Sequence, residues 1–135
     1  MRNKGFTLIE LLAVIVILAI IALIATPIVL GIINDSRKSA DQETAKLIAS
    51  NFGLAYQAAY MGNGGIEPTL AEVMGKFNMD NATVAESGTE YTITSKSENV
   101  VCTTATTGQK VNLTCKVNKE NFAEASNSIT IKAAS

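Results

Sequence analysis

The chain has 135 residues, of which 47% are hydrophobic and 17% charged, and it carries a net charge of −1. This length suits one domain of ordinary size, and the weak charge excludes the broad basic surface that binds nucleic acid regardless of sequence. The chain has no histidine, which removes the commonest general base and the commonest metal ligand. We therefore expect no enzyme, no metal site, no cofactor and no direct nucleic-acid partner.

The first third of the chain is dominated by an apolar run. Leu11–Ile33 contains no charged residue, and a helix of this length spans roughly 34 Å, slightly more than the ~30 Å hydrocarbon core of a bilayer. Arg2 and Lys4 precede the run, and such flanking cations stay in the cytoplasm. The run predicts a single-pass membrane helix that places everything after Asp35 outside.

Two simpler interpretations of this segment compete with a specialised one. A secretory signal has an apolar region of about 7–15 residues that ends at an Ala-x-Ala-like site, whereas this run is longer and residues 13–33 contain no such tripeptide. A plain membrane anchor fits the length but does not explain Glu10. A charge near the bilayer centre costs about 2.5–3.5 kcal/mol on insertion scales, so its presence needs a reason.

Small and helix-weakening residues interrupt the second half of the run. Ala19, Ala22 and Ala25 recur every third residue, and such strips let apolar helices approach closely, although alanine is also simply common in membrane helices. Pro27 removes a backbone hydrogen bond and Gly31 lowers helix propensity. We expect residues 23–31 to bend or loosen under load.

The stretch GFTLIE, residues 5–10, with Lys4 before it and the apolar helix behind, closely resembles the prepilin signature of type IV pilins and their pseudopilin relatives. The resemblance is close through the apolar run, and beyond it only the architecture is similar. In that family a membrane-embedded aspartyl peptidase cuts after the glycine and methylates the new amino terminus. The resemblance implies cleavage between Gly5 and Phe6, removal of residues 1–5 as a leader, and N-methylation of Phe6.

The resemblance also implies a role for Glu10. In the family this carboxylate pairs with the terminal amine of a neighbouring subunit, which here belongs to Phe6. The cost of an unpaired charge in the bilayer would then drive docking into a filament, and the pair would set the axial offset. The alternative is a Glu10 that merely reaches the membrane interface. Family subunits also carry a proline where Pro27 stands, so Pro27, Gly31 and Ala22 are expected to serve bending and packing of the helix.

An amphipathic pattern follows Asp35 and predicts that the helix continues to about Tyr60. Asp41 and Lys46 are expected to lie off its apolar face. The residues assigned to that face at helical spacing are Thr44, Leu47, Ile48, Asn51, Phe52, Ala55, Ala58 and Ala59.

The glycines of MGNGG, residues 61–65, suit the end of this helix. Thr69 and Glu72 fit the capping box of a short second helix that ends near Met74, before Gly75. Residues 66–86 are interpreted as a variable connector.

Four short segments rich in Val, Ile and Thr predict antiparallel strands at residues 91–94, 100–106, 110–117 and 128–132. Gly108 and Gln109 suit a two-residue type II′ turn. The resulting register places Cys102 opposite Cys115 in a non-hydrogen-bonded pair with Cα atoms about 4.5 Å apart, within the range of a disulfide. It also predicts an inward face of Val100, Cys102, Val111, Leu113 and Val117 and a solvent face of Lys110, Asn112 and Lys116.

These elements predict an α+β, type IV pilin-like fold, in which a long N-terminal helix packs on an antiparallel sheet of about four strands. We expect a leader at residues 1–5, a transmembrane or filament-core segment at 6–33 and an extracytoplasmic globular domain at 34–135. Family members commonly tie the C-terminal region to the sheet with a disulfide, whereas both cysteines here lie in one hairpin. This departure leaves the site of any adhesion open.

The leading functional hypothesis is a structural subunit, a major pilin, that polymerises into a pilus serving adhesion, twitching motility or biofilm formation. The alternative is a pseudopilin of a type II secretion or competence DNA-uptake system. Secretion pseudopilins commonly have a calcium site, and no loop dense in Asp and Asn suggests one here. The expected partners are other copies of the chain, minor pilins, the prepilin peptidase and methyltransferase, the assembly platform with its ATPase, and the membrane. The expected location is the cell membrane before assembly and an extracellular pilus afterwards.

Overall fold

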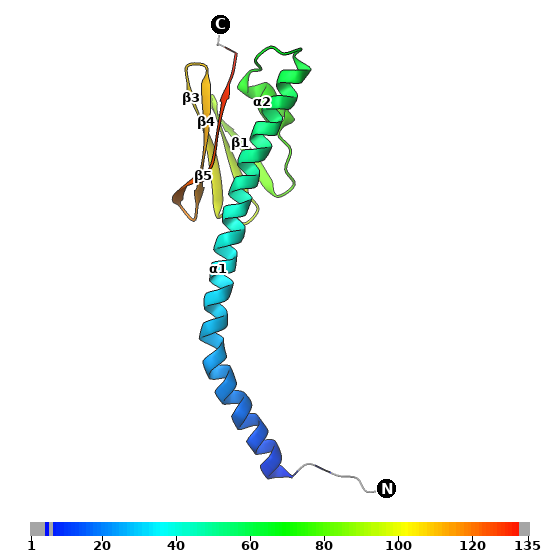
Figure 1. Cartoon of the computed structure of the whole chain (residues 1–135), viewed down its shortest axis with the longest axis vertical. Coiled ribbons are helices and arrows are strands. Elements are labelled where there is room, and N and C mark those ends of the chain that lie inside the picture. The colour runs from blue at the N-terminus through cyan, green and yellow to red at the C-terminus, as the bar shows by residue number, and fades with distance from the viewer. Residues whose placement is uncertain (1–4, 6, 133–135) are drawn as a thin grey trace. The chain divides into compact units, whose positions relative to one another are not determined.

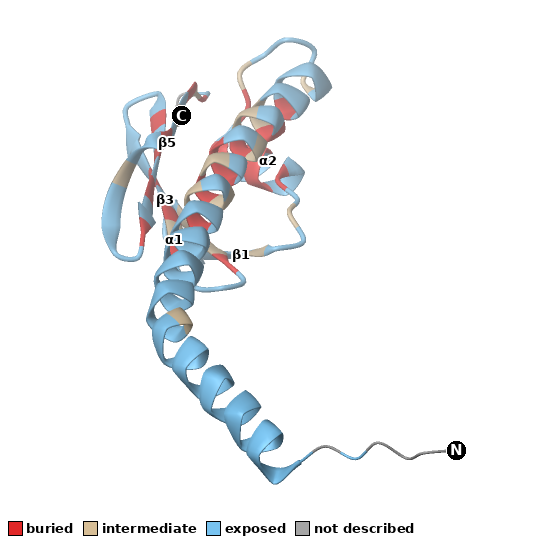
Figure 2. Ribbon diagram, turned by 60° about the horizontal axis from the view of Figure 1, so that its bottom comes forward, coloured by how far each residue is buried: buried red, intermediate tan, exposed pale blue. Residues whose placement is uncertain are grey.

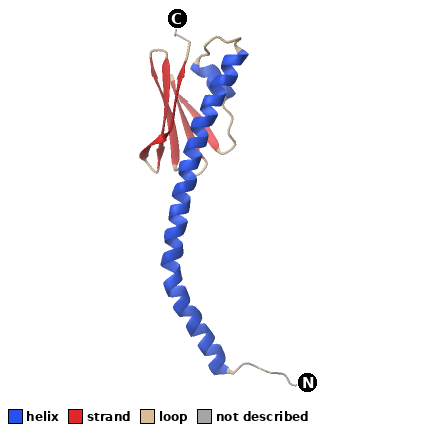
Figure 3. Cartoon of the chain, viewed as in Figure 1, coloured by secondary structure: helices blue, strands red, loops and turns tan. Residues whose placement is uncertain are grey.

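The computed structural model describes Gly5 and residues 7–132. Helix α1 (Leu8–Gly62) and helix α2 (Leu70–Lys76) precede five strands (Figure 1). The strands are β1 (Ala82–Ser87), β2 (Glu90–Ser95), β3 (Val100–Thr107), β4 (Lys110–Val117) and β5 (Glu120–Thr130). The predicted α+β, type IV pilin-like layout is confirmed, with five strands instead of four (Figure 3).

The chain forms two compact units, residues 1–37 and residues 38–135. The part of α1 in the first unit is long and apolar enough to cross a membrane, and its most apolar stretch is not buried within the described chain. Figure 2 shows this part of the helix as exposed at almost every position. Leu12, Ile21 and Ile28, for example, each expose more than half of their surface. We call the charge-free segment Leu11–Ile33 the apolar rod.

The second unit contains one antiparallel sheet in which consecutive strands are neighbours, in the order β1-β2-β3-β4-β5. The predicted register of the β3–β4 hairpin is confirmed, since Thr107 pairs with Lys110 and Cys102 with Cys115. Gly108, the first residue of the turn, has a φ of +63°, the left-handed value that the predicted turn requires. Cys102 and Cys115 form a disulfide with their Cα atoms 4.0 Å apart.

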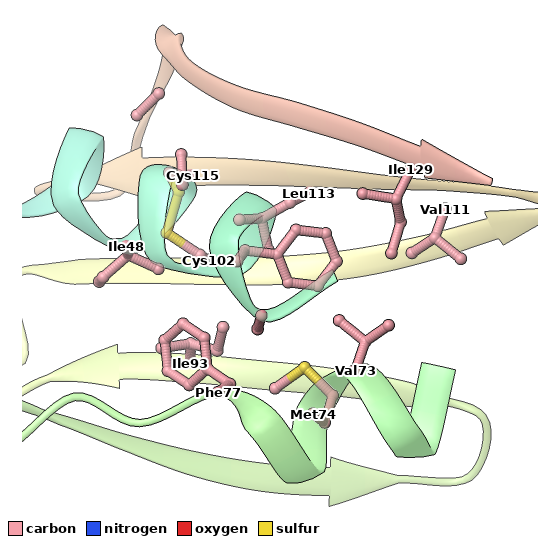
Figure 4. Close-up of a cluster of buried hydrophobic side chains, with 14 of the residues drawn as sticks. Ile48, Val73, Met74, Phe77, Ile93, Cys102, Val111, Leu113, Cys115 and Ile129 are labelled. Carbon is pink, nitrogen blue, oxygen red and sulfur yellow. A yellow bond between two sulfur atoms is a disulfide. The ribbon is translucent and has the colours of Figure 1, made fainter. Parts of the chain in front are cut away.

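The part of α1 that belongs to this unit, residues 38–62, is called its outer half. The core of the unit lies where this outer half, α2 and one face of the sheet meet. Ile48 comes from α1, Val73 and Met74 from α2, and Leu113 from the sheet (Figure 4). The predicted inward face of the hairpin is confirmed, and its solvent face carries the exposed residues Lys110, Asn112 and Lys116. The fully or nearly fully buried members of the core from the hairpin are Val100, Cys102, Val111, Leu113, Cys115 and Val117.

Two strands differ from the prediction. Strand β1 (Ala82–Ser87) overlaps the end of residues 66–86, which the sequence suggested were a connector. The sequence did not predict this strand because five of its six side chains are exposed and give no apolar alternation. Strand β5 begins at Glu120 rather than Ser128. Its pairing with β4 shifts between Leu113 and Cys115, so residues 123–126 bulge out of the ladder and break the period of two.

The buried face of the outer half of α1 is rotated relative to the predicted face. Leu47 and Ala58 are exposed, whereas Ala45 and Ala49 are buried. Asp41, predicted to lie off this face, is only 8% exposed. Ser97 Oγ donates to its Oδ1 at 3.4 Å and Asn99 Nδ2 donates to its Oδ2 at 3.2 Å. These two hydrogen bonds from neutral side chains of the β2–β3 loop compensate for the burial of the Asp41 carboxylate.

Helix α2 has the predicted capping box, in which Thr69 and Glu72 each accept from the other's backbone N–H. The Thr69 backbone N–H, followed by the Asn63 side chain, lowers the pKa of Glu72. The helix extends through Gly75 to Lys76 rather than ending at Met74. Phe77 anchors the last turn, because its N–H donates to the Val73 carbonyl at 3.1 Å and its side chain is buried.

A side chain of β5 fixes the position of α1 against the sheet. Asn127 Nδ2 donates to the backbone carbonyl of Ala49 at 2.8 Å. The Asn127 amide can approach the helix this closely only because residue 53 is a glycine: a Cβ at Gly53 would lie 2.6 Å from Asn127 Nδ2. This close approach explains a glycine in the middle of a helix, where it costs about 0.8–1.0 kcal/mol relative to alanine.

Replacing this glycine tests the contact. Gly53→Ala should lower the free energy of unfolding of the second unit, because the new methyl group displaces the half-buried Asn127 amide from the Ala49 carbonyl. A polar group left without its partner costs about 1–3 kcal/mol, which exceeds the gain in helix propensity. The measurement is denaturant unfolding of the full chain in detergent. In an Asn127→Ala background the same substitution should become stabilising. A stabilising Gly53→Ala in both backgrounds would show that the contact does not constrain this position.

Candidate processing and assembly site

Gly5, the residue before the predicted cleavage position, lies in open backbone. Gly5 is exposed and belongs to no helix or strand, and a Cβ built on it would meet nothing within 4 Å. Unhindered backbone, which a glycine provides, is what a peptidase requires at a scissile bond. Phe6, the predicted new terminus and methylation site, lies outside the described residues.

Thr7 and Glu10 form a capping box at the start of α1. The Thr7 backbone N–H donates to Glu10 Oε2 at 3.1 Å, and the Glu10 N–H donates to Thr7 Oγ1 at 3.2 Å. The pair satisfies two of the amides that a helix leaves free at its N-terminus. The sequence analysis missed the role of Thr7, although the spacing Thr-x-x-Glu before an apolar run is the usual signal for this cap.

The cap places the Glu10 carboxylate at the positive end of the helix dipole, one turn from where a new terminus at Phe6 would begin. An anion is favoured there even before a second charge approaches. The Glu10 side chain is exposed in the single chain, so a cation from another molecule can reach it. The arrangement suits an intermolecular ion pair at the end of the rod.

The other predicted residues of the rod lie within an uninterrupted helix. Helix α1 runs without a break through Pro27 and Gly31. The expected bending or loosening of residues 23–31 under load stays a prediction. Thr26 Oγ1 donates to the Ala22 carbonyl at 2.6 Å. Pro27 has no N–H, so it offers no donor to the carbonyl of Leu23 one turn earlier. A Cβ at Gly31 would meet nothing within 4 Å, so this position offers a close approach to a neighbouring helix.

No catalytic arrangement is evident where the chain is described. Among Gly5 and residues 7–132, no three His, Cys, Asp or Glu side chains gather closely enough to hold a metal ion. The described cysteines are both in the Cys102–Cys115 disulfide. The candidate site consists of the exposed Gly5, the capped Glu10 carboxylate and the exposed apolar side chains of the first part of α1.

The family model described as the prokaryotic N-terminal methylation motif matches residues 1–26. The chain carries the type IV prepilin signature. The match includes Gly5, Glu10 and the first part of the apolar rod, and it implies processing by a prepilin peptidase and use of a pilus assembly machinery. Comparison with curated proteins and with solved structures finds no match.

The prepilin signature and the α+β layout together support a member of the type IV pilin and pseudopilin family, whose members are structural proteins rather than enzymes. They also support a chain anchored in the membrane before assembly. The signature does not extend into the second unit, which must be interpreted from its own structure.

Proposed function

We propose that this chain is a major pilin, which is stored in the cell membrane and then polymerised into a type IV pilus. The observation that carries the proposal is the continuity of the prepilin signature with an apolar rod whose described side chains are exposed. Exposed apolar surface of this extent is unstable in water, at about 25 cal/mol per Å². A bilayer covers it in the stored subunit, and the rods of other copies cover it in the filament.

The proposed pathway assigns a step to each part of the site. Cleavage after Gly5 removes Arg2 and Lys4 and creates an amine at Phe6, which is then methylated. Glu10 accepts the terminal amine of a neighbouring copy, so that two charges unfavourable in the bilayer neutralise each other in the filament core. Ala22 and Gly31 allow close packing of the rods, and Pro27 allows local bending. The chain itself performs no catalysis.

The second unit supplies the outer surface of the proposed pilus. The Cys102–Cys115 disulfide joins β3 to β4, and such bridges persist in oxidising extracellular environments. The proposal therefore places this unit outside the cell, where it would serve adhesion, twitching motility or biofilm formation. Minor pilins and the assembly platform with its ATPase are the other partners that this function requires.

Shearing of native cells tests the proposal against its alternative, a pseudopilin of a type II secretion or DNA-uptake system. The chain should be abundant in the sheared fraction and should decorate long filaments in immunogold micrographs. A processed chain that stays in the membrane fraction, without long surface filaments, would contradict the major-pilin proposal and favour the pseudopilin.

Replacing Glu10 separates its role in capping the helix start from the role of its charge in assembly. Glu10→Gln keeps a side-chain oxygen for the Thr7 N–H but removes the charge, so cleavage and membrane insertion should persist. Filament yield should fall by about tenfold or more, which corresponds to about 1.4 kcal/mol of lost pairing. The measurement is the sheared-filament yield relative to the processed chain in membranes.

Thr7→Val is the matched control, because it removes the hydroxyl half of the cap and keeps the carboxylate. It should assemble far better than Glu10→Gln. Normal filaments from Glu10→Gln, or equal losses from the two variants, would show that the charge does not direct docking.

A further inference from the structure

A cavity of about 480 Å³ opens on the second unit where two turns of the sheet meet. One turn joins β2 to β3 and the other joins β4 to β5, and the antiparallel order of the strands brings both to the same end of the sheet. The Asn118 backbone N–H donates to the Asn99 carbonyl at 2.7 Å, which ties the two turns together. The volume is within the range of about 300–1,000 Å³ that small-molecule sites occupy. The lining residues are Glu98, Asn99, Val101, Lys116, Asn118 and Lys119.

The cavity lies on the face of the sheet that is turned away from the core. Val101 pairs with Lys116 across β3 and β4, whereas the neighbouring pair of Val100 and Val117 is buried in the core. Val101 is half-buried and supplies an apolar surface, and the other lining residues are exposed and polar or charged. An apolar surface beside a few hydrogen-bonding groups is the usual composition of a site for a small polar ligand.

The lining carries one net positive charge. Lys116 and Lys119 contribute two ammonium groups, and Glu98 contributes one carboxylate. A ligand with a single negative charge therefore complements the cavity. The amides of the two lining asparagines can each donate and accept, so they suit hydroxyl groups next to that charge. Asn99 is already held in place, because its Nδ2 donates to the buried Asp41 carboxylate at 3.2 Å.

The backbone at this cavity has an unusual conformation. Glu98, Asn118 and Lys119 have φ values of +62°, +53° and +70°, and they are the described residues other than glycine with a positive φ. Asparagine tolerates this left-handed conformation, whereas it is unfavourable for Glu and Lys. Asn118 and Lys119 form the two-residue turn between β4 and β5, where glycine commonly takes the second position. Lys119 therefore stands where a side chain costs stability, a feature that is common at functional sites.

We propose that this cavity binds an acidic saccharide, a sugar unit that carries one carboxylate, such as a uronic acid of a polysaccharide. The Lys116 and Lys119 ammonium groups bind the carboxylate, the carbon atoms of the ring cover Val101, and Asn118 and Glu98 bind its hydroxyl groups. A simple anion would use the two lysines and leave the apolar surface and the amides without a role. The inference goes beyond the proposed polymerisation, because binding needs only the folded second unit.

Titration of the full chain in detergent with glucuronate, followed by the NMR shifts of its backbone amides, tests this site. Saturable shifts should appear at residues 98–101 and 116–119. Glucose has the same ring without the carboxylate, and acetate has the carboxylate without the ring. Each should bind about tenfold more weakly or less, since each lacks one set of the contacts.

Lys119→Gly separates binding from folding. Glycine is favoured at a φ of +70°, so the thermal unfolding midpoint of the second unit should rise, while the affinity for glucuronate should fall about tenfold with the loss of one ammonium group. The matched control is Lys110→Gln, which removes the same charge from an exposed lysine at the other end of β4. The control should bind glucuronate with unchanged affinity.

The outcomes separate this inference from the proposed function. Equal affinity for glucuronate and acetate, or no saturable shift, would overturn the saccharide site. Unchanged binding by Lys119→Gly, or an equal loss in Lys110→Gln, would also overturn it, because binding would then not depend on this cavity. Glucuronate binding by a chain that forms no surface filaments would support the site and contradict only the major-pilin role. Filaments of a chain that does not bind glucuronate would contradict only the site.

Discussion

The uncovered apolar rod is the constraint on which the rest of the molecule depends. Leu11–Ile33 contains no charge and its large side chains are exposed along the helix. Covering a single large apolar side chain is worth about 1.5–3 kcal/mol, so many such side chains together exclude a free, water-surrounded state. Under the proposed function the chain has two stable environments, a bilayer and a bundle of other rods. Function in the proposed pilus is the transfer from the first to the second.

Helix α1 changes character in three steps that match three environments. The rod is apolar on all sides. Asp35 to Lys46 is rich in charge, as expected for a segment in water just beyond the membrane. Leu47 to Gly62 is again uncharged, yet it packs one face in the core and leaves another face exposed.

The globular unit is built so that the sheet holds the helix in one register. The Asp41 carboxylate accepts from Ser97 and Asn99 at one end of the packed segment, and the Ala49 carbonyl accepts from Asn127 further along. These polar contacts specify position, because they are satisfied in a single alignment of helix and sheet. A subunit that is pulled from a membrane by its helix needs such an attachment to carry its outer surface with it.

The sequence was informative where several independent signals coincided. The β3–β4 register followed from the Gly108 turn, the alternation of apolar residues and the placement of Cys102 and Cys115. It was less informative where structure depends on tertiary contacts. Strand β1 has exposed side chains and no apolar period, and the rotation of the buried helix face depends on donors that reach Asp41 from a distant loop. At the processing site, Gly5, Phe6 and Glu10 came from the family signature, whereas the Thr7 cap was present as a local pattern and overlooked.

Intact mass together with N-terminal sequencing of the chain sheared from native cells tests the central claim most directly. The account predicts a chain that begins at a methylated Phe6, lacks residues 1–5 and comes from long surface filaments. A chain that still begins at Met1 would contradict the account, because the terminal amine would then lie nine residues before Glu10 instead of four and the rod would be only a membrane anchor.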